Sequence, residues 1–350
     1  MPSHRHALTT GTLFALAAGL MWGLVFVAPT MLAEYPAVLL TMGRYLAFGL
    51  IALPLAWWDR ARLAELTRAD WVEAAKLAAV GNVLYYLCLA AAIQRAGGPL
   101  PTMIIGTLPV VIAITANLRS VASGPKHGKH DKQERKQERK QERRQESRLP
   151  WLRLLPSLGL IATGLACVNH AEITQLPADT DLARYGLGAL LAVAALICWT
   201  WYPLRNAEWL RAHADRSPRA WATAQGLVTL PMALVGYALF WAWQALQPSV
   251  PGSPAFAMPF GPEPMLFVGL MLAMGLFASW LGTLCWNEAS QRLPPALAGQ
   301  LIVFETLAAL AYAYLLRAAW PGWVTGVGVA LLVAGVVMAL RVRSIAHRNA

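Results

Sequence analysis

The sequence predicts an all-α integral membrane protein with ten transmembrane helices, arranged as two inverted five-helix repeats. Three observations predict this fold. Only 13% of the 350 residues are charged and 57% are hydrophobic, whereas an ordinary globular chain has about 25% charged residues. Residues 11–33 contain no charge, and about 20 such residues span the hydrocarbon of a bilayer. The third observation is that the chain matches itself over much of its length.

Ten apolar segments are bounded by charges or by Gly, Pro and Asn residues. Backbone groups in a bilayer must bond within their own segment or within a closed barrel, and these segments lack strand alternation, so we expect each to be a helix. The segments are 11–33, 36–58, 72–94, 99–118, 151–170, 184–204, 218–246, 264–287, 294–316 and 322–342.

Prolines and glycines locate the ends and breaks of several segments. The first segment follows a basic start, as in a signal peptide, but its length and the lack of a small-residue cleavage site predict that it is retained as a helix. Gly97-Gly98-Pro99 begins the fourth segment, Leu108-Pro109 lies within it, and Leu293-Pro294-Pro295 begins the ninth. The Pro-rich stretch 247–264 leaves the end of the seventh least defined.

The basic residues orient the chain. Ten spans put both termini on one side, and placing that side in the cytoplasm gives 24 Lys and Arg inside against 3 outside. Removing the basic loop 119–153 still leaves 12 against 3. Cytoplasmic loops of membrane proteins carry this excess of positive charge. We therefore expect a multi-pass protein of the cell inner (plasma) membrane with both termini cytoplasmic.

A charged low-complexity segment, 120–150, separates two apolar parts of the chain. It contains KQERKQERKQERRQE, which places like charges at i and i+4 and has no apolar face. We interpret it as a solvated cytoplasmic linker, disordered or transiently helical, with contact to anionic lipid headgroups as the alternative. Since 11 of the 29 Lys and Arg lie between Lys126 and Arg153, the net charge of +11 does not indicate a nucleic-acid partner.

The self-match occurs at two offsets, 177 residues over the first two segments and 197 over the third. The matched residues are Gly11 with Gly188, Trp22 with Trp199, Gly49 with Gly226, Pro54 with Pro231, Cys88 with Cys285, Ala92 with Ala289, and Gln94-Arg95 with Gln291-Arg292. Because five spans are an odd number, the second copy enters the membrane from the opposite face. Inverted repeats of this kind are typical of secondary transporters, in which two similar halves enclose a site near the membrane midplane.

These features divide the chain into five parts. Residues 1–119 form the first repeat with spans 1–4, 120–150 are the linker, and 151–170 supply the fifth span. Residues 184–343 form the second repeat with spans 6–10, and 344–350 are a cytoplasmic tail.

Four short motifs carry a resemblance to a known family. They are Met21-Trp22-Gly23, Pro36-x-x-Leu followed by Arg44, Leu108-Pro109-Val110, and Phe304-Glu305-Thr306. The chain resembles the EamA-type carriers of the drug/metabolite transporter superfamily over nearly its whole length. This resemblance implies a ten-helix inner-membrane carrier with two inverted repeats that exports amino acids or other small metabolites. The KQER linker and Thr306, where the family often has proline, depart from the family pattern.

Two charged residues lie inside predicted spans. Arg44 is about 12 Å along its helix from Pro36 at 1.5 Å per residue, where an arginine faces the bundle interior and needs a partner. It is a candidate clamp for a substrate carboxylate, or else a structural arginine bonded to carbonyls of a broken helix. Glu305 lies near the midplane of its segment and is a candidate for proton coupling or for binding a substrate ammonium. A structural hydrogen bond or a pair with Arg44 are its alternatives.

Four further residues complete the candidate substrate site. Trp22 and Trp199 occupy matching positions in the two repeats, about half-way down spans 1 and 6. Tyr85 and Gln300 could contact a solute from spans 3 and 9. Most aromatics in such helices pack against neighbours, and an amide such as Gln300 more often bonds a neighbouring helix.

Other function classes lack the residues they need. The sequence has no Ser/His/Asp set, no metal-spaced His and no Cys-x-x-Cys, so we predict no enzyme activity, no catalytic residues, no cofactor and no metal site. The four cysteines are expected to be small buried hydrophobic residues. Expected partners are a small-molecule substrate and the lipid bilayer, with protons as a candidate coupling ion. A multidrug efflux carrier and a non-transporting receptor or scaffold remain as alternatives to metabolite export.

Overall fold

The computed structural model describes residues 4–109, 111–112, 115, 151–174, 181–246, 256–293, 295–316, 318 and 320–346. All regular secondary structure in these residues is helical. Seven helical stretches are long and apolar enough to cross a membrane: Ala7–Met31, Ala37–Trp58, Arg68–Ala96, Leu182–Ala212, Pro218–Leu246, Pro264–Arg292 and Leu297–Leu316. Two shorter apolar helical stretches are Leu155–Val168 and Trp323–Gly335.

The first half of the chain contains several interrupted helices. Its elements are α1 (His4–Gly23), the 3-10 helix η1 (Leu24–Phe26), α2 (Val27–Met31), α3 (Ala37–Trp58), α4 (Arg60–Leu63), α5 (Arg68–Leu77), the π-helix η2 (Ala78–Leu84), α6 (Tyr85–Ala96), α7 (Pro99–Gly106) and α10 (Trp151–Ile173). A capping box starts α5, because Thr67 and Asp70 satisfy each other's backbone N–H groups.

The second half is also built from helices, several of them interrupted. They are α11 (Leu182–Ala212), α12 (Pro218–Leu246), α13 (Pro264–Ala273), the π-helix η3 (Met274–Leu281), α14 (Gly282–Arg292), α15 (Pro295–Leu301), α16 (Val303–Leu316) and α17 (Trp323–Ala346). The Asp181 carboxylate caps the start of α11 by accepting from the N–H groups of Ala183 and Arg184 (3.0 and 3.1 Å).

Several predicted boundaries differ from the observed ones. The segment 184–204 continues as helix to Ala212, because Arg205, Glu208 and Arg211 suit a solvated helical turn as well as a loop. Segment 11–33 is interrupted after Gly23, and 294–316 is interrupted at Ile302. Within 99–118, α7 ends at Gly106, just before the expected break at Leu108-Pro109. The linker 120–150 lies outside the described residues.

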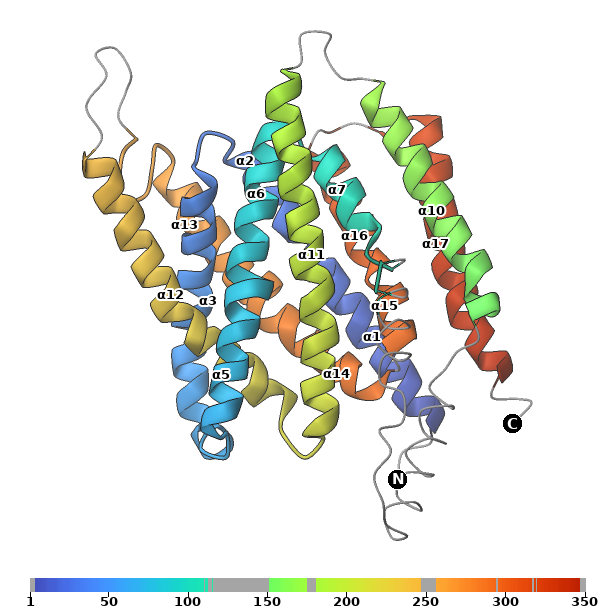
Figure 1. Cartoon of the computed structure of the whole chain (residues 1–350), viewed down its shortest axis with the longest axis horizontal. Coiled ribbons are helices and arrows are strands. Elements are labelled where there is room, and N and C mark those ends of the chain that lie inside the picture. Colours follow the sequence, from blue (N-terminus) through green and yellow to red (C-terminus); the bar gives the residue numbers. More distant parts are fainter. Residues whose placement is uncertain are drawn as a thin grey trace, which may run out of the picture.

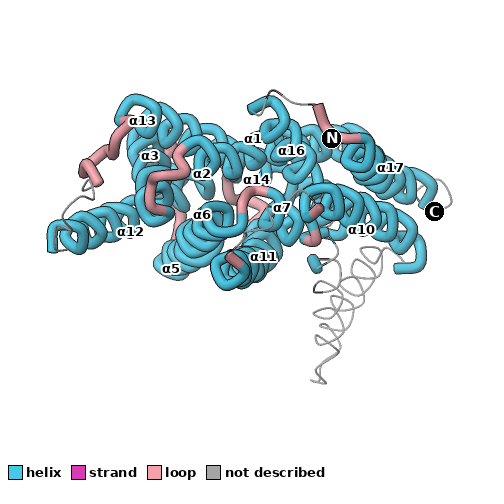
Figure 2. The backbone as a smooth tube through the Cα atoms, turned by 90° about the horizontal axis from the view of Figure 1, so that it is seen from above, coloured by secondary structure: helices cyan, strands magenta, loops and turns pink. Residues whose placement is uncertain are grey.

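The helices form one oblong bundle. Seen from above, α12, α13 and α3 lie at one end and α10 with α17 at the other (Figure 2). In the middle, α6 packs along α11, while α1 packs against α14 and α16. Figure 1 shows that α1 begins and α17 ends at the same edge of the bundle, which we call the lower edge. The opposite edge is called the upper edge.

Small residues bring the end helices into close contact. A Cβ placed on Gly49 of α3 would lie 2.5 Å from Cβ of Leu230, and one on Gly226 of α12 would lie 2.7 Å from Cβ of Ala52. Gly49 and Gly226 are a matched pair in the self-alignment, so the repeated glycines are where the two repeated helices touch. Close packing through small residues is a main source of helix association in lipid.

Candidate functional site

A buried arginine lies on α3, with 4% of its surface exposed. The Nε of Arg44 donates to Oγ of Ser279 (2.9 Å), and its Nη2 donates to the carbonyl oxygen of Ala278 (3.3 Å). Its Cζ lies 5.0 and 4.5 Å from the ring centroids of Tyr45 and Tyr86, which adds cation–π attraction. Its Nη1 is buried and has no hydrogen-bond partner among the described residues.

The acceptors of Arg44 lie on η3, the π-helical segment of the second half. A π-helix interrupts regular i→i+4 bonding, and such segments are frequent at functional sites. The contacts of Arg44 are those of an arginine that bonds a distorted helix, which is one of the two roles that the sequence left open. Contact with a substrate stays a prediction for this residue.

Glu305 is a second buried ionisable residue, with 1% of its surface exposed. It lies in the first turn of α16, just after the interruption at Ile302. Trp199 donates its Nε1–H to Oε2 (3.1 Å), and the Tyr85 hydroxyl donates to Oε1 (3.5 Å). No ion pair within 4.0 Å joins Glu305 to Arg44 in the described part of the chain. The contacts seen are therefore hydrogen bonds rather than the predicted alternative of a pair with Arg44.

The two matched tryptophans meet between the halves. The rings of Trp22 and Trp199 are 4.8 Å apart, edge to face. Trp22 also contacts Trp286 at 5.2 Å, while Trp199 stacks on Tyr85 at 4.5 Å and on Tyr202 at 5.2 Å. An aromatic cluster thus encloses Glu305 from α1, α6, α11 and α14.

Gln300 bonds a helix that does not belong to this cluster. Its Nε2 donates to Oγ of Ser157 on α10 (3.3 Å), and its Oε1 is buried without a partner among the described residues. Of the five predicted substrate residues and the predicted coupling residue Glu305, the structure thus brings Trp22, Tyr85, Trp199 and Glu305 into one set of contacts. Arg44 reaches the same region through Tyr86, the neighbour of Tyr85 on α6.

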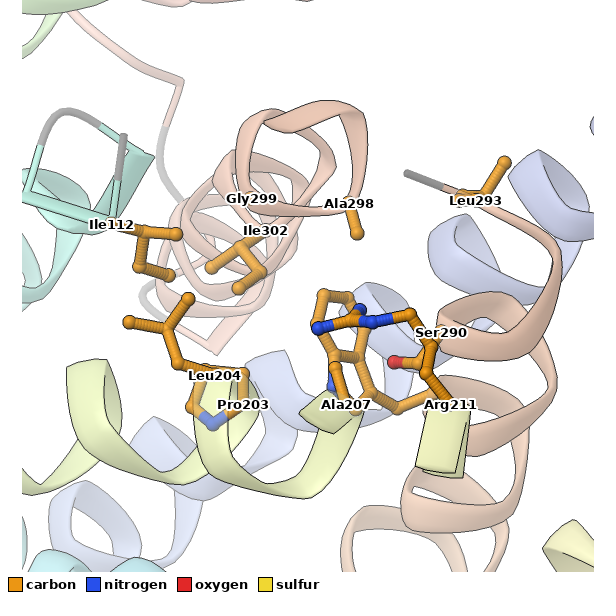
Figure 3. A pocket seen from close by; sticks show the side chains of 11 residues that line it. Ile112, Pro203, Leu204, Ala207, Arg211, Ser290, Leu293, Ala298, Gly299 and Ile302 are labelled. Carbon is orange, nitrogen blue, oxygen red and sulfur yellow. The ribbon is translucent and has the colours of Figure 1, made fainter. Parts of the chain in front are cut away.

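A small cavity lies beside the aromatic cluster (Figure 3). Its lining comes from α11, α14, α15 and the residues after α7: Ile112, Pro203, Leu204, Ala207, Arg211, Trp286, Ser290, Leu293, Ala298, Gly299 and Ile302. Trp286 belongs both to the lining and to the aromatic cluster. The cavity extends from there toward the C-terminal end of α11, which is at the lower edge of the bundle in Figure 1.

Sequence reasoning missed the polar residues of this cavity, Arg211, Trp286 and Ser290. The available signal was the self-match of Cys88 with Cys285, which makes α14 the counterpart of α6. It predicts that α14 packs on span 1 as α6 packs on span 6.

Polar side chains next to the cavity join three helices. Asn206 of α11 donates Nδ2–H to Oδ1 of Asn287 on α14 (2.8 Å), and its own Oδ1 accepts from Nε1 of Trp221 on α12 (2.8 Å). Gln225 accepts from the Tyr202 hydroxyl (2.9 Å) and donates to Asn206 (3.3 Å). Asn287 thus makes an interhelical hydrogen bond.

Ion pairs connect the two halves at the lower edge. Arg205 on α11 bonds both carboxylate oxygens of Glu73 on α5, and Arg219 on α12 bonds both of Asp59. Arg216 pairs with Glu65 (2.7 Å). In each case the first half supplies the carboxylate and the second half the guanidinium. Arg–carboxylate pairs that are bidentate are the strong ones.

Loops close the upper edge around Tyr35. Its hydroxyl accepts from the backbone N–H of Glu263 (2.7 Å), and its carbonyl accepts from Nε2 of Gln94. Its ring stacks on Phe267 at 5.2 Å and meets Phe256 edge to face at 5.3 Å. Aromatic packing around Tyr35 thus joins the loop before α3 to α13 and to the segment that precedes it.

No group of three or more His, Cys, Asp or Glu side chains within the described ranges is placed to hold a metal ion. The four cysteines are free thiols, with Cys88 and Cys198 buried and Cys167 and Cys285 half-buried.

Comparisons with known proteins agree with this architecture. A family model described as the EamA-like transporter family matches residues 9–120. The chain is 50% identical over 336 residues to the inner membrane protein YtfF of Escherichia coli (strain K12), and this match covers 96% of each chain. A solved crystal structure with 18% identity has a TM-score of 0.60 and covers 95% of this chain and 98% of that one, which shows a shared fold.

Proposed function

Because this chain belongs to the EamA-type family of drug/metabolite transporters and is a multi-pass inner-membrane transporter, we propose that it is a secondary-active carrier that exports a small metabolite such as an amino acid. Transport would proceed by alternating access between two inverted five-helix repeats. Both termini would then lie in the cytoplasm, at the lower edge of Figure 1.

The single observation that carries this proposal is the central cluster. Glu305 and Arg44 are buried between helices of both halves, and Trp22 meets its repeat partner Trp199 there. Ionisable residues inside a membrane are costly and mark substrate or ion pathways. Substrate sites of inverted-repeat carriers lie at this kind of interface, next to discontinuous helices.

Helix packing supports the two-repeat organisation. The contact of α1 with α14 corresponds to that of α11 with α6, and the contact of α1 with α16 corresponds to that of α11 with α7. α3 packs on its counterpart α12, and α10 packs on α17. The π-helices η2 and η3 end at Leu84 and Leu281, at the 197-residue offset of the self-match. α1 and α11 cross the bundle in opposite directions (Figure 1).

Charge supports the orientation. The ion pairs of the lower edge and the end of α11 hold Arg205, Arg211, Arg216 and Arg219, which the sequence assigns to the cytoplasm. With the lower edge in the cytoplasm, the cavity between the central cluster and the end of α11 would lie on the cytoplasmic side of the cluster.

Transport of labelled solutes into proteoliposomes tests the proposal. We expect at least one amino acid from a panel of labelled amino acids and nucleobases to accumulate above protein-free vesicles, and a pH gradient to change its rate. Accumulation of hydrophobic cationic dyes in place of every metabolite would identify a multidrug efflux carrier. A folded protein that moves neither class would contradict a carrier function.

A further inference from the structure

The cavity of Figure 3 contains hydrogen-bond donors that the protein itself leaves unused. Ser290 Oγ and Trp286 Nε1 are buried and have no hydrogen-bond partner among the described residues. Each residue is 2% exposed, and each lines the cavity. A buried polar group without a partner is destabilising, because it has lost its hydrogen bonds to water. Two such groups on one cavity therefore indicate that a ligand supplies their partners.

An arginine reaches the same cavity from another helix. Figure 3 shows the side chain of Arg211 on α11 extending into the space that Ser290 lines from α14. Arg211 is the one charged residue among the described residues of the lining. Glu208, one turn earlier on α11, bonds Arg205 and does not line the cavity. The polar groups of the lining are thus a guanidinium, an indole N–H and a hydroxyl.

The rest of the lining is apolar. It includes Leu204, Leu293 and Ile302 and the other apolar residues named above. Pockets for small ligands are mostly apolar, with few polar groups that fix orientation, and this lining has that composition.

We propose that this cavity binds the carboxylate of a small solute with an apolar body, with Arg211, Ser290 and Trp286 as donors to the carboxylate. A guanidinium matches a carboxylate geometrically, and a cation would find no acidic partner among the described lining residues. The apolar wall favours a carboxylic acid with a short hydrocarbon chain over inorganic phosphate. The proposal rests on the carrier function above and names its substrate class.

Binding is measured on the purified full-length chain in detergent, as the ligand-induced rise of the unfolding temperature. The four probes are isovalerate, its neutral amide isovaleramide, the cation isoamylamine, and inorganic phosphate. We expect isovalerate alone to stabilise the protein. We expect Arg211→Gln to weaken this binding at least about tenfold, since hydrogen bonds to charged groups are the stronger class. Ser290→Ala and Trp286→Phe should weaken it by a smaller factor.

A matched control separates the cavity from the general charge of the lower edge. Arg62 is 54% exposed and pairs with Asp59 (3.6 Å), so Arg62→Gln removes the same charge away from the cavity and should leave isovalerate binding unchanged. Stabilisation by the amine or by phosphate, no stabilisation by isovalerate, or unaltered binding in Arg211→Gln would each overturn the proposal.

The binding assay tests the site and the transport assay tests the carrier function, so failure of one proposal can be distinguished from failure of the other. Isovalerate binding that depends on Arg211, without transport of any solute, would keep the site and reject the carrier function. Transport of a labelled solute at the wild-type rate by Arg211→Gln would keep the carrier function and reject this site.

Discussion

Glu305 accepts hydrogen bonds from two neutral donors, Tyr85 and Trp199. A carboxylate can accept from both at once, whereas a protonated carboxyl has one oxygen that must donate. Gain and loss of a proton would therefore change which of these bonds form. Because Trp199 lies on α11 and Glu305 on α16, protonation of Glu305 would change a contact between these two helices.

We predict that Glu305→Gln abolishes transport driven by a pH gradient and leaves equilibrative exchange of the solute measurable. Glutamine resembles the protonated carboxyl and cannot release a proton. Labelled solute is followed in proteoliposomes with and without the gradient. Trp199→Phe is the companion variant, because it removes one donor and keeps the carboxyl group. Concentration of solute by Glu305→Gln at the wild-type rate would exclude Glu305 as the coupling site.

For Arg44, we predict that Arg44→Gln lowers the unfolding temperature of the purified protein and that Arg44→Lys restores it in part. Arginine bonds Ser279 and Ala278 through two different nitrogens, each bond contributing about 1.5–3 kcal/mol. Lysine keeps the charge but lacks the planar fork. Ser279→Ala removes one acceptor and should have a smaller effect. Wild-type stability of Arg44→Gln, with impaired transport, would instead indicate substrate contact.

The sequence predicted that these residues lie deep within the bundle, but it did not predict which groups they bond. Arg44 and Glu305 are conspicuous because charge is rare in apolar segments, and the self-match selected Trp22 and Trp199. The self-match does not reveal that Arg44 bonds η3, because that contact depends on backbone groups. Arg211 could not be distinguished from other cytoplasmic arginines, since its role depends on which way α11 continues past residue 204.

At the scale of helices, α10 and α17 pack through paired glycines. A Cβ on Gly164 would lie 2.6 Å from the carbonyl oxygen of Gly328, and one on Gly328 would lie 2.7 Å from that of Gly164. Both obstacles are backbone atoms, which cannot rotate aside. These two helices form one end of the bundle (Figure 2), so the distance between them determines how closely that end is packed.

We predict that Gly164→Ala lowers the unfolding temperature, because the two backbones must move apart and lose packing along the interface. Gly159→Ala is the matched control on the same helix, since a Cβ there meets nothing within 4 Å. Thermal unfolding of both variants in the same detergent measures the difference. Equal unfolding temperatures for the two variants would show that the contact tolerates a methyl group.

Helix existence was more predictable than helix continuity. Hydropathy and charge located the apolar segments, and prolines located the starts of α7 and α15. The π-helices η2 and η3 and the interruption at Ile302 were not predicted, because each is a change of hydrogen-bond register within an unbroken apolar run. Such changes depend on tertiary contacts, as the bonds from Arg44 to η3 illustrate.

For the molecule as a whole, we predict that replacing 120–150 with a short Gly/Ser loop leaves transport intact. The prediction follows from the KQER pattern, which has no apolar face with which to pack. Transport rates in proteoliposomes, normalised to the amount of inserted protein, compare the variant with the parent chain. Loss of transport in a correctly inserted variant would assign the linker a role beyond connection.

In the ion pairs of the lower edge, the first half supplies the carboxylates and the second half supplies the arginines. On the proposed repeat, the 177-residue offset matches Arg205, Arg216 and Arg219 of the second half to Ala28, Leu39 and Met42 of the first. If two first halves packed against each other, the carboxylates of Glu73, Glu65 and Asp59 would therefore face uncharged side chains. If the two halves are repeats, these ion pairs favour association of a first half with a second half over association of two first halves.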